Sequence, residues 1–435
     1  MSEIIRHAGR ILGYVSVGFI IRVLVSAHFK EILRARVEIT TPMNDWRRAH
    51  EAVFLWNSGL DPYAGNIFHE YPMSLQFYKF IISYFNVDLV LAATDVATAI
   101  LLQISAFHQH STDNHCQEKA RDISFKVLKA YLFSPITIVS CAGASTSTFS
   151  NFLIAIVTCS LPVETFRAFT CVLCALLACN NIHYSTLILP IFLCQEYCSY
   201  RRRSGAKRAE ADLKPYYQGH DFYSSLATSA SICFATLVIL MSLSYIIMGN
   251  SWSFVGSTYI YALKVQDLAP NIGMLWYFFT EMFEQFLEFF TWIMQINSFI
   301  HVIPLSVLLR DTPFFALYVI LFTSTLFQPY PALSSIGLIT SLLPQWAELF
   351  PHMKRMLILC CSAISCVSLW PIFWYLWIDL GTANSNFYFG ATLAFTATLV
   401  VFLLDLLNSH IHLTTKRRYS VEQLNQMGVD KATIQ

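Results

Sequence analysis

The chain has 435 residues, of which 55% are hydrophobic and 13% are charged, and its formal net charge is +1. This composition, with a mean hydropathy of +0.51, excludes a soluble domain and indicates a multi-spanning membrane protein. The lysines and arginines gather in a few hydrophilic stretches and not along one face, which argues against nucleic acid as a partner.

Apolar runs near the ~20 residues needed to cross a bilayer recur along the chain, and they predict an all-α protein with about twelve transmembrane helices. These runs lie near residues 8–28, 88–108, 126–142, 146–163, 165–181, 183–199, 226–249, 283–309, 313–328, 331–347, 354–374 and 387–407. The run 72–86 is short, begins with Pro72 and contains Lys79, so we expect it to lie in the membrane interface without crossing. Residues 1–408 then form a single polytopic membrane domain, and residues 409–435 form a cytosolic polar tail.

Basic residues near the ends of the spans predict which loops face the cytosol. The main clusters lie at 201–208, at 416–418 and at Lys119, Arg121, Lys126 and Lys129. If the run 72–86 does not cross, these clusters share one side with the amino terminus, so we expect both termini in the cytosol. The large first hydrophilic loop, at about residues 29–87, then lies on the opposite side, together with loops 250–282 and 375–386.

Several ionisable side chains fall inside or beside the apolar runs. Charge within a membrane usually marks an internal pair or a cavity, although sequence alone does not choose the partners. These residues are Arg22, Asp88, Asp95, Arg167, His183, Asp379 and Asp405.

All of the 12 cysteines except Cys116 also fall in or beside apolar runs, so no disulfide framework is expected. Cys171 and Cys174 have the spacing of a redox or metal pair. Small polarizable side chains also pack well between helices, and we favour that interpretation. We expect neither a bound metal nor a cofactor.

A large first loop followed by many spans resembles the GT-C superfamily of lipid-linked sugar transferases. Those enzymes carry acidic residues early in this loop, commonly as an Asp-x-Asp-like pair, because a carboxylate must take a proton from the acceptor hydroxyl or position a cation. Here the pair is broken, since the only carboxylate in the corresponding stretch is Asp45, beside Asn44. A mannosyltransferase that uses Asp45 as its base remains the alternative function, ahead of a transporter or flippase, for which an internal repeat would be expected.

Asp45 also stands directly before the run "WRRAHEAVFLWNSG", which reads as a helix. Asparagine and aspartate at this position accept hydrogen bonds from the first helical amides, so we favour a cap, with the helix ending at Gly59. Further along the loop, His69 and Glu70 resemble a metal or base pair. Neighbours in sequence rarely face one site, and we favour a local polar turn.

Four stretches carry a closer resemblance. The stretches "SGLDPYAGNIFHEYP" at 58–72, "DLAPNIGMLWYFFTEMFEQF" at 267–286, "QINSFIHVIPL" at 295–305 and "LWIDLGTANSNFYF" at 376–389 resemble the signatures of the GPI transamidase subunit U family. The match extends from about residue 30 to about residue 407. It implies a GT-C-like, non-catalytic subunit of the endoplasmic reticulum complex that attaches glycosylphosphatidylinositol (GPI) to proteins, with the cysteine-protease-like chemistry on another subunit and the first loop in the lumen.

The motif "GTANSNFYF" at 381–389 is the best candidate for a GPI-binding site. Asparagine amides can donate to phosphate or sugar hydroxyls without the desolvation cost of a charge, and the small residues around them allow close approach. On residues alone, Asn384 capping the next span is equally acceptable. The resemblance favours binding, because Asn384 and Asn386 match lipid-contacting asparagines of the family. The family's basic contact would fall among residues 201–203, and Arg203 is the candidate, although such a cluster also determines topology or contacts anionic membrane lipids.

A second candidate region follows a break at Pro270, Asn271 and Gly273. If the following residues form one helix, Glu281, Glu284 and Glu288 recur on one face. Near a membrane such a stripe should face water, a cavity or a partner, or it can simply favour the helix dipole. We therefore mark Glu281, Glu284 and Asn271 as contacts to a cavity or to another subunit.

Overall fold

The computed structural model describes residues 2–65, 67–111, 117–204, 217 and 219–418 of the chain. Regular structure in these ranges is helical, and the described residues contain no β-strand beyond an isolated bridge between Asp45 and Ser145. The all-α class is thus confirmed. The chain divides into two compact units, Met1–Gln345 and Trp346–Gln435, called unit 1 and unit 2 below. The single membrane domain of residues 1–408 stays a prediction, because two compact units can share one membrane.

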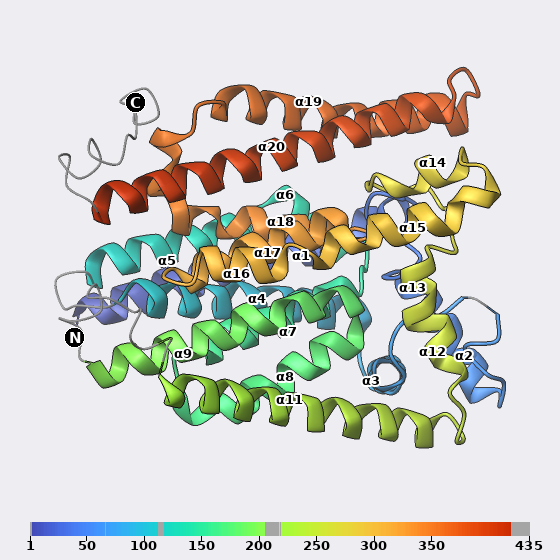
Figure 1. The fold of residues 1–435 in the computed structure, drawn as a ribbon. Coiled ribbons are helices and arrows are strands. Elements are labelled where there is room, and N and C mark those ends of the chain that lie inside the picture. Colours follow the sequence, from blue (N-terminus) through green and yellow to red (C-terminus); the bar gives the residue numbers. More distant parts are fainter. Residues whose placement is uncertain (1, 66, 112–116, 205–216, 218, 419–435) are drawn as a thin grey trace. The chain divides into compact units, whose positions relative to one another are not determined.

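Unit 1 is built from helices that run alongside one another in Figure 1. The main ones are α1 (Ser2–Arg34), α4 (Val87–His110), α5 (Gln117–Leu132), α6 (Pro135–Ala142), α7 (Ser147–Ser160), α8 (Arg167–Asn180), α9 (Ile188–Ser204), α11 (His220–Ile247), α15 (Glu284–Phe299), α16 (Val302–Leu308), α17 (Pro313–Phe327) and α18 (Leu333–Leu342). Shorter elements connect them: α2 (Trp46–Asn57), α3 (Pro72–Tyr84), η2 (Glu164–Phe166), η3 (Ile182–Leu187), α12 (Ser253–Val255), η5 (Gly256–Ile260), α13 (Tyr261–Lys264) and α14 (Leu275–Thr280). The helical segment η6 (Leu343–His352) contains the boundary between the units.

Among the described residues, six helices are long and apolar enough to cross a membrane, and the bent pair α5–α6 would make seven. Each of the six overlaps an expected span, and shorter apolar helices such as α7 and α17 overlap others. The count of twelve crossings therefore stays a prediction. Helix α3 has 13 residues, or about 20 Å of helix, which is less than the ~30 Å of a hydrocarbon core.

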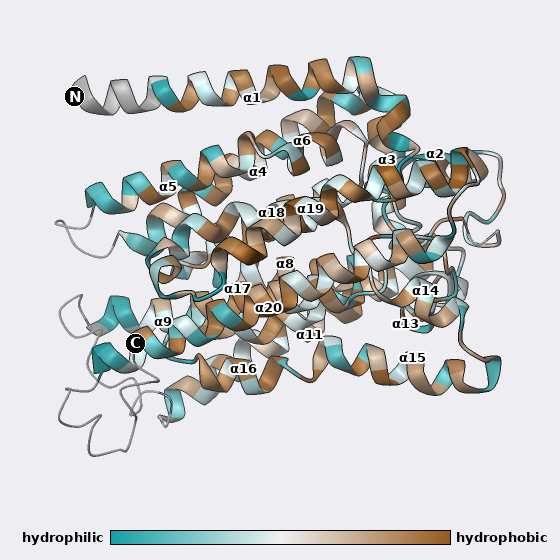
Figure 2. Ribbon diagram, turned by 90° about the horizontal axis from the view of Figure 1, so that it is seen from above, coloured by the Kyte–Doolittle hydropathy of each residue, from teal (hydrophilic) through white to brown (hydrophobic). Residues whose placement is uncertain are grey.

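The two ends of unit 1 differ. Helices α2 and α3 lie at one end with α12, α13 and α14, whereas the start of α1, the start of α5 and the end of α9 lie at the other (Figure 1). Figure 2 shows hydrophilic residues at the start of α5 and the end of α9. This arrangement groups the basic clusters of unit 1 together, as the charge pattern predicts, while the side of the membrane that they face stays a prediction.

A buried ion pair between Arg22 and Asp95 joins α1 to α4, with Nε of the arginine 2.5 Å from Oδ2 of the aspartate. The Tyr131 hydroxyl of α5 donates to Oδ1 of the same carboxylate at 2.7 Å. Arg22 Nη1 donates to the carbonyl oxygen of Leu132 at 2.9 Å. Because an unbonded charge in hydrocarbon is costly, this network accounts for two of the intramembrane charges as an internal pair that ties three helices together.

Unit 2 contains α19 (Met356–Trp374), the π-helical turn η7 (Tyr375–Asp379) and α20 (Ser385–Arg418). The two long helices lie side by side and antiparallel (Figure 1). Asp405 of α20 accepts a hydrogen bond from the backbone amide of Arg355 at 3.2 Å, directly before α19 begins, so this carboxylate supplies an acceptor at the helix start. Helix α20 continues to Arg418, into the segment expected to be a polar tail, and residues 419–435 of that tail lie outside the described residues.

Candidate functional site

Polar side chains gather in two places that the sequence marked. One is a small cavity beneath the first loop of unit 1, and the other is the turn between η7 and α20 in unit 2. The two places belong to different units, so each is described separately.

The first loop begins with the helix α2, and its start is fixed by side-chain hydrogen bonds. Asp45 Oδ1 accepts from the backbone amide of Arg47 at 2.9 Å, and Asn44 Oδ1 accepts from that of Thr41 at 2.6 Å. The helix ends at Asn57 and is followed by Gly59 in the left-handed region, with φ of +76°. The predicted cap and the predicted end of this helix are confirmed.

The cavity lies beside the cap and is lined by polar residues from five parts of unit 1. It has a volume of about 40 Å³. The polar lining residues are Asn44, Glu70, Thr146, Ser147, Ser150, Asn180, Asn181, Tyr184, Gln328, Tyr330 and Ser335. The Asn44 Nδ2 group is buried and has no hydrogen-bond partner among the described residues. A space of this size admits ordered water but is too small for a sugar ring.

Glu70 is the buried carboxylate of this cavity. The Tyr78 hydroxyl donates to Oε2, and the Thr146 hydroxyl donates to Oε1 at 2.7 Å. Burial raises the pKa of Glu70 to about 7, and the two hydrogen bonds oppose that rise because they favour the charged form. The carboxylate therefore links the first loop to α3 and to the start of α7, and both of its oxygens are occupied by protein donors.

His69 points to a different part of unit 1. Its Nδ1 lies 2.8 Å from the carbonyl oxygen of Ser257, which can only accept, so Nδ1 carries the proton. The ring stacks on Tyr261 with a centroid distance of 3.5 Å and an interplanar angle of 8°. As expected, these neighbours do not share one site. The expected local turn is wrong, however, because both side chains are buried and bond to distant elements.

No sequence pattern indicates the partners of Glu70. Thr146 lies 76 residues away from it along the chain, and Thr146 belongs to no motif named above. The stack of Tyr261 on Tyr330, with centroids 5.8 Å apart, likewise joins elements that are far apart in sequence. Only the packing of unit 1 brings these side chains together around the cavity.

In unit 2 the turn after η7 is held by backbone hydrogen bonds. The carbonyl oxygen of Leu376 accepts from the amides of Thr382 at 3.0 Å and of Ala383 at 3.1 Å, and Gly381 has φ of +64°. Asn384 directly precedes α20, and Asn386 lies in its first turn. Both asparagine residues are exposed. No hydrogen bond joins the Asn384 side chain to the described residues, so the structure lacks the side-chain cap that was the alternative interpretation.

An aromatic cluster lies directly beneath this turn. Trp374 packs edge-on against Trp377, with ring centroids 5.6 Å apart, and against Tyr388 at 5.4 Å. Tyr388 is fully buried. Such amphipathic rings are typical of the headgroup level of a membrane. The cluster therefore joins the start of α20 to the end of α19 and to η7.

Arg203 lies in the last turn of α9 and is exposed. Its Nη2 is 3.3 Å from Oε1 of Glu164. The other end of α9 continues from η3, close to the cavity residue Asn181, so the whole length of α9 separates Arg203 from the cavity.

The acidic stripe expected after residue 280 is not one helical face. Helix α14 ends at Thr280 and α15 begins at Glu284, so Glu281 lies in the break between them, whereas Glu284 and Glu288 lie on α15. All three glutamates are exposed. The chain leaves the helix at residues 281–283, where Phe283 is extended, so α14 and α15 are separate elements and the i, i+3, i+7 pattern does not describe a stripe.

Asn271 is buried and bonded within its own loop. Its Oδ1 accepts from the amide of Gly273 at 2.7 Å, and its Nδ2 donates to the carbonyl oxygen of Ala269 at 3.2 Å. The side chain thus shapes the turn before α14.

The chain is similar in sequence to known proteins over most of its length. Residues 16–395 match the family described as GPI transamidase subunit PIG-U. The GPI-anchor transamidase component PIGU of Homo sapiens is 31% identical over 405 residues, which cover 88% of this chain and 89% of that protein. The component of the same name from Mus musculus is 30% identical, with the same coverage. The GPI transamidase component GAB1 of Saccharomyces cerevisiae is 26% identical over 393 residues, covering 89% of this chain and 91% of that protein.

Proposed function

This chain belongs to the PIG-U family of GPI transamidase subunits, and on that basis we propose that it is a non-catalytic subunit that binds the GPI lipid. In this role it presents the lipid to a cysteine-protease-like catalytic subunit, which attaches it to the C-terminus of precursor proteins. The proposed location is the endoplasmic reticulum membrane, with both termini in the cytosol and a GT-C-like architecture of about twelve crossings.

The observation that carries this proposal is the turn at residues 381–386. Two exposed asparagine residues stand side by side at the start of α20, on a turn whose backbone groups are already bonded to the Leu376 carbonyl. An amide can both donate to a phosphate oxygen and exchange hydrogen bonds with sugar hydroxyls. The Asn384 side chain makes no hydrogen bond with a described residue, so its amide is available to a glycan-phosphate headgroup, and Asn386 is exposed two residues further on. We place the Trp374 cluster at the depth of the lipid.

A non-catalytic role is supported by how the first loop uses its acids. Asp45 accepts a hydrogen bond from an amide of its own helix, and Glu70 accepts from Tyr78 and Thr146. The neighbouring cavity is about 40 Å³, too small for a sugar donor. These side chains hold the loop together. We therefore propose that the chain has a GT-C-like architecture but no glycosyltransferase activity.

Two further residues are proposed to contact other subunits. Glu281 and Glu284 are exposed in and after the break between α14 and α15, where charged side chains would be costly against lipid. Arg203 stays a proposed second contact of the GPI lipid, as the family resemblance implies, and in the structure its Nη2 lies 3.3 Å from Oε1 of Glu164. The two asparagines are the contacts that the following substitutions test.

The test is photocrosslinking of a GPI lipid in membranes that carry Asn384→Ala and Asn386→Ala together. Loss of two hydrogen-bonding amides worth about 1 kcal/mol each predicts binding that is weaker by about 30-fold. GPI attachment to a reporter protein should fall in parallel, while co-purification with the other subunits stays unchanged.

Asn408→Ala is the matched control, because Asn408 is an exposed asparagine on the same helix, far from the turn. It should leave crosslinking and attachment at the wild-type level. If the double variant crosslinks GPI as well as wild type does, the lipid site is not at this turn.

A further inference from the structure

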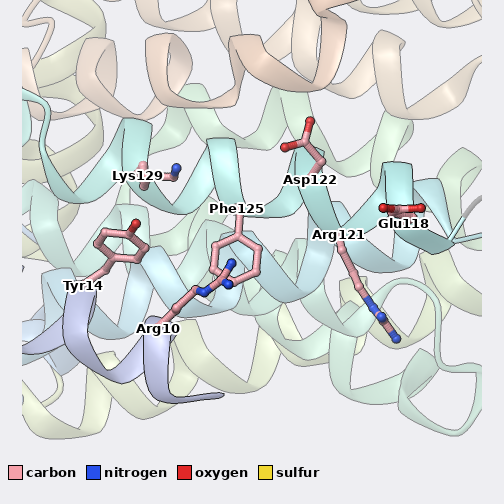
Figure 3. A pocket seen from close by; sticks show the side chains of 7 residues that line it. All are labelled: Arg10, Tyr14, Glu118, Arg121, Asp122, Phe125 and Lys129. Atoms are coloured by element: carbon pink, nitrogen blue, oxygen red, sulfur yellow. The ribbon is translucent and has the colours of Figure 1, made fainter. Parts of the chain in front are cut away.

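A second pocket lies between α1 and α5, at the end of unit 1 opposite to the first loop (Figures 1 and 3). Its volume is about 530 Å³, within the range of small-molecule sites. Figure 3 shows its seven lining side chains, two from α1 and five from α5: Arg10, Tyr14, Glu118, Arg121, Asp122, Phe125 and Lys129. None of them takes part in the proposed GPI site.

The pocket lies where a membrane-spanning helix meets the headgroup layer. Arg10 is next to Gly9, where the apolar part of α1 begins. The first turns of α5 are hydrophilic, as Figure 2 shows, and the helix becomes apolar beyond them. Tyr14 lies one turn after Arg10 on α1, and Phe125 lies between the charged residues Asp122 and Lys129 on α5, so a ligand would meet charges and aromatic rings together.

The charges in the pocket are unevenly balanced. Arg10, Arg121 and Lys129 form no ion pair with a described residue, and the Lys129 ammonium lies 5.5 Å from the centre of the Tyr14 ring. Asp122 is paired with Lys126 at 2.6 Å, and in Figure 3 its carboxylate points away from Arg10. Arg10 and Phe125 point toward one another in the same view. With Asp122 neutralised by its partner, three cations face a single carboxylate, that of Glu118.

We propose that this pocket binds the phosphate-bearing headgroup of an anionic membrane phospholipid. Guanidinium groups match phosphate oxygens in geometry and charge, and basic pockets between spans are the sites at which anionic headgroups are held. A cluster that served only to set topology would need the charges but neither a cavity nor aromatic rings among them. The inference goes beyond the proposed function, because it concerns a second lipid at the other end of unit 1.

A lipid in this pocket would contact α1 and α5 at once. Because it would bind only when these two helices are packed together, it would stabilise the packed arrangement. Helices α1 and α5 also supply Arg22 and Tyr131 to the buried network around Asp95, further along the same pair. The headgroup would thus stabilise the outer end of a pair whose middle is held by the ion pair.

The test uses the assembled complex in nanodiscs of phosphatidylcholine that contain a trace of photoactivatable phosphatidylinositol. Crosslinked peptides are mapped by mass spectrometry, with photoactivatable phosphatidylcholine as the neutral probe. The anionic probe should label the peptides around Arg10 and Phe125 well above the neutral probe. Each basic side chain near a membrane surface is worth about fivefold in binding, so Arg10→Gln with Arg121→Gln should reduce this labelling by about 25-fold.

Arg202→Gln is the matched control, because it makes the same substitution in the last turn of α9, at the same end of unit 1, at a residue that is paired with Glu164 and does not line the pocket. It should change labelling less than either single variant, Arg10→Gln or Arg121→Gln. The side chains of Arg10 and Arg121 are exposed, so neither single substitution should disturb folding. The single variants can therefore be measured if the double variant fails to assemble.

Four results would overturn the proposal. Equal labelling by the two probes would mean an ordinary lipid-facing surface. Equal loss in Arg202→Gln and in the pocket variants would mean unspecific surface charge. Loss of labelling on addition of inorganic phosphate or soluble inositol phosphate would make the ligand a soluble phosphate, and crosslinks to another subunit in its place would make it a protein.

Discussion

The first-loop cavity of unit 1 and the turn of unit 2 both gather polar side chains, but they direct them differently. At the cavity, Glu70 and His69 are buried and bond to other parts of the protein. At the turn, Asn384 and Asn386 are exposed, while the amides of Thr382 and Ala383 and the Thr382 hydroxyl close the loop on the Leu376 carbonyl. The comparison teaches that a polar residue in a suggestive motif can recognise a ligand only after the fold has met its own needs for hydrogen bonds.

The difference has an energetic basis. A buried carboxylate without partners would be too costly, so Glu70 must be bonded within the protein whatever its ancestral use. An exposed asparagine on a turn forms hydrogen bonds with water, and a ligand can replace that water at little cost in free energy. Substitutions at the cavity should therefore change stability, and substitutions at the turn should change ligand binding with little change in stability.

The largest effect is expected at the buried ion pair between Arg22 and Asp95. Asp95→Ala leaves the Arg22 guanidinium without its carboxylate between α1 and α4. Removing one partner of a buried pair costs about 3–5 kcal/mol, so we expect a strongly lowered unfolding temperature of the purified complex and a smaller amount of it in membranes.

The double variant Arg22→Leu with Asp95→Leu separates charge from packing. With both charges replaced by apolar groups, most of the lost stability should return, because no isolated charge is left behind. A double variant as unstable as Asp95→Ala would show that the hydrogen bonds from Tyr131 and to the Leu132 carbonyl matter more than the ion pair itself.

The next effect concerns the pH dependence of the first-loop cavity. Burial raises the pKa of Glu70 from 4.5 to about 7, so the folded protein holds a proton that the unfolded chain has lost. Below pH 4.5 this proton contributes about 3 kcal/mol to the free energy of unfolding, and the contribution is lost as the pH rises to about 7. Unfolding temperatures measured across this window should fall as the pH rises.

Glu70→Gln should flatten this dependence, because the amide does not titrate and can still bond to the hydroxyls of Tyr78 and Thr146. Asn386→Ala, at the exposed turn, should leave the slope of the wild type intact. If the unfolding temperature of Glu70→Gln falls with pH as steeply as that of the wild type, a group other than Glu70 titrates. The proposed difference between the two regions would then be wrong.

How much of this could be read from the sequence depends on the distance between interacting residues. The cap at Asp45, the end of α2 at Gly59 and the turn at Gly381 rest on neighbours within a few residues, and each follows from its local motif. The apolar runs likewise predicted the long helices, since membrane-length hydrophobicity is a local property.

Contacts across the fold could not be predicted. The link from Glu70 to Thr146 depends on how α3 and α7 pack, and no periodicity in either segment encodes it. The acidic stripe failed for a related reason, because Glu281 and Glu284 were placed on one helix although the chain breaks between them. The pairing of Arg22 with Asp95 was open for the same reason, since seven charges had to be matched without knowing which helices touch.

The smallest stability effect, and the sharpest functional contrast, is expected at Asp45. Asp45→Ala removes the acceptor for the Arg47 amide and should cost about 1 kcal/mol. Asp45→Asn keeps a side-chain oxygen in the same place, so its stability should match that of the wild type. If Asp45 only caps α2, GPI attachment in Asp45→Asn membranes should stay close to the wild-type rate.

A catalytic base would behave in the opposite way. Asparagine cannot take a proton, so a transferase that relied on Asp45 would lose activity by orders of magnitude in Asp45→Asn, despite unchanged stability. Such a result would show that Asp45 takes part in catalysis and that its capping of α2 is secondary. The Asn substitution thus tests the comparison at its most sensitive point, because it preserves the structural use of this side chain and removes only the chemical one.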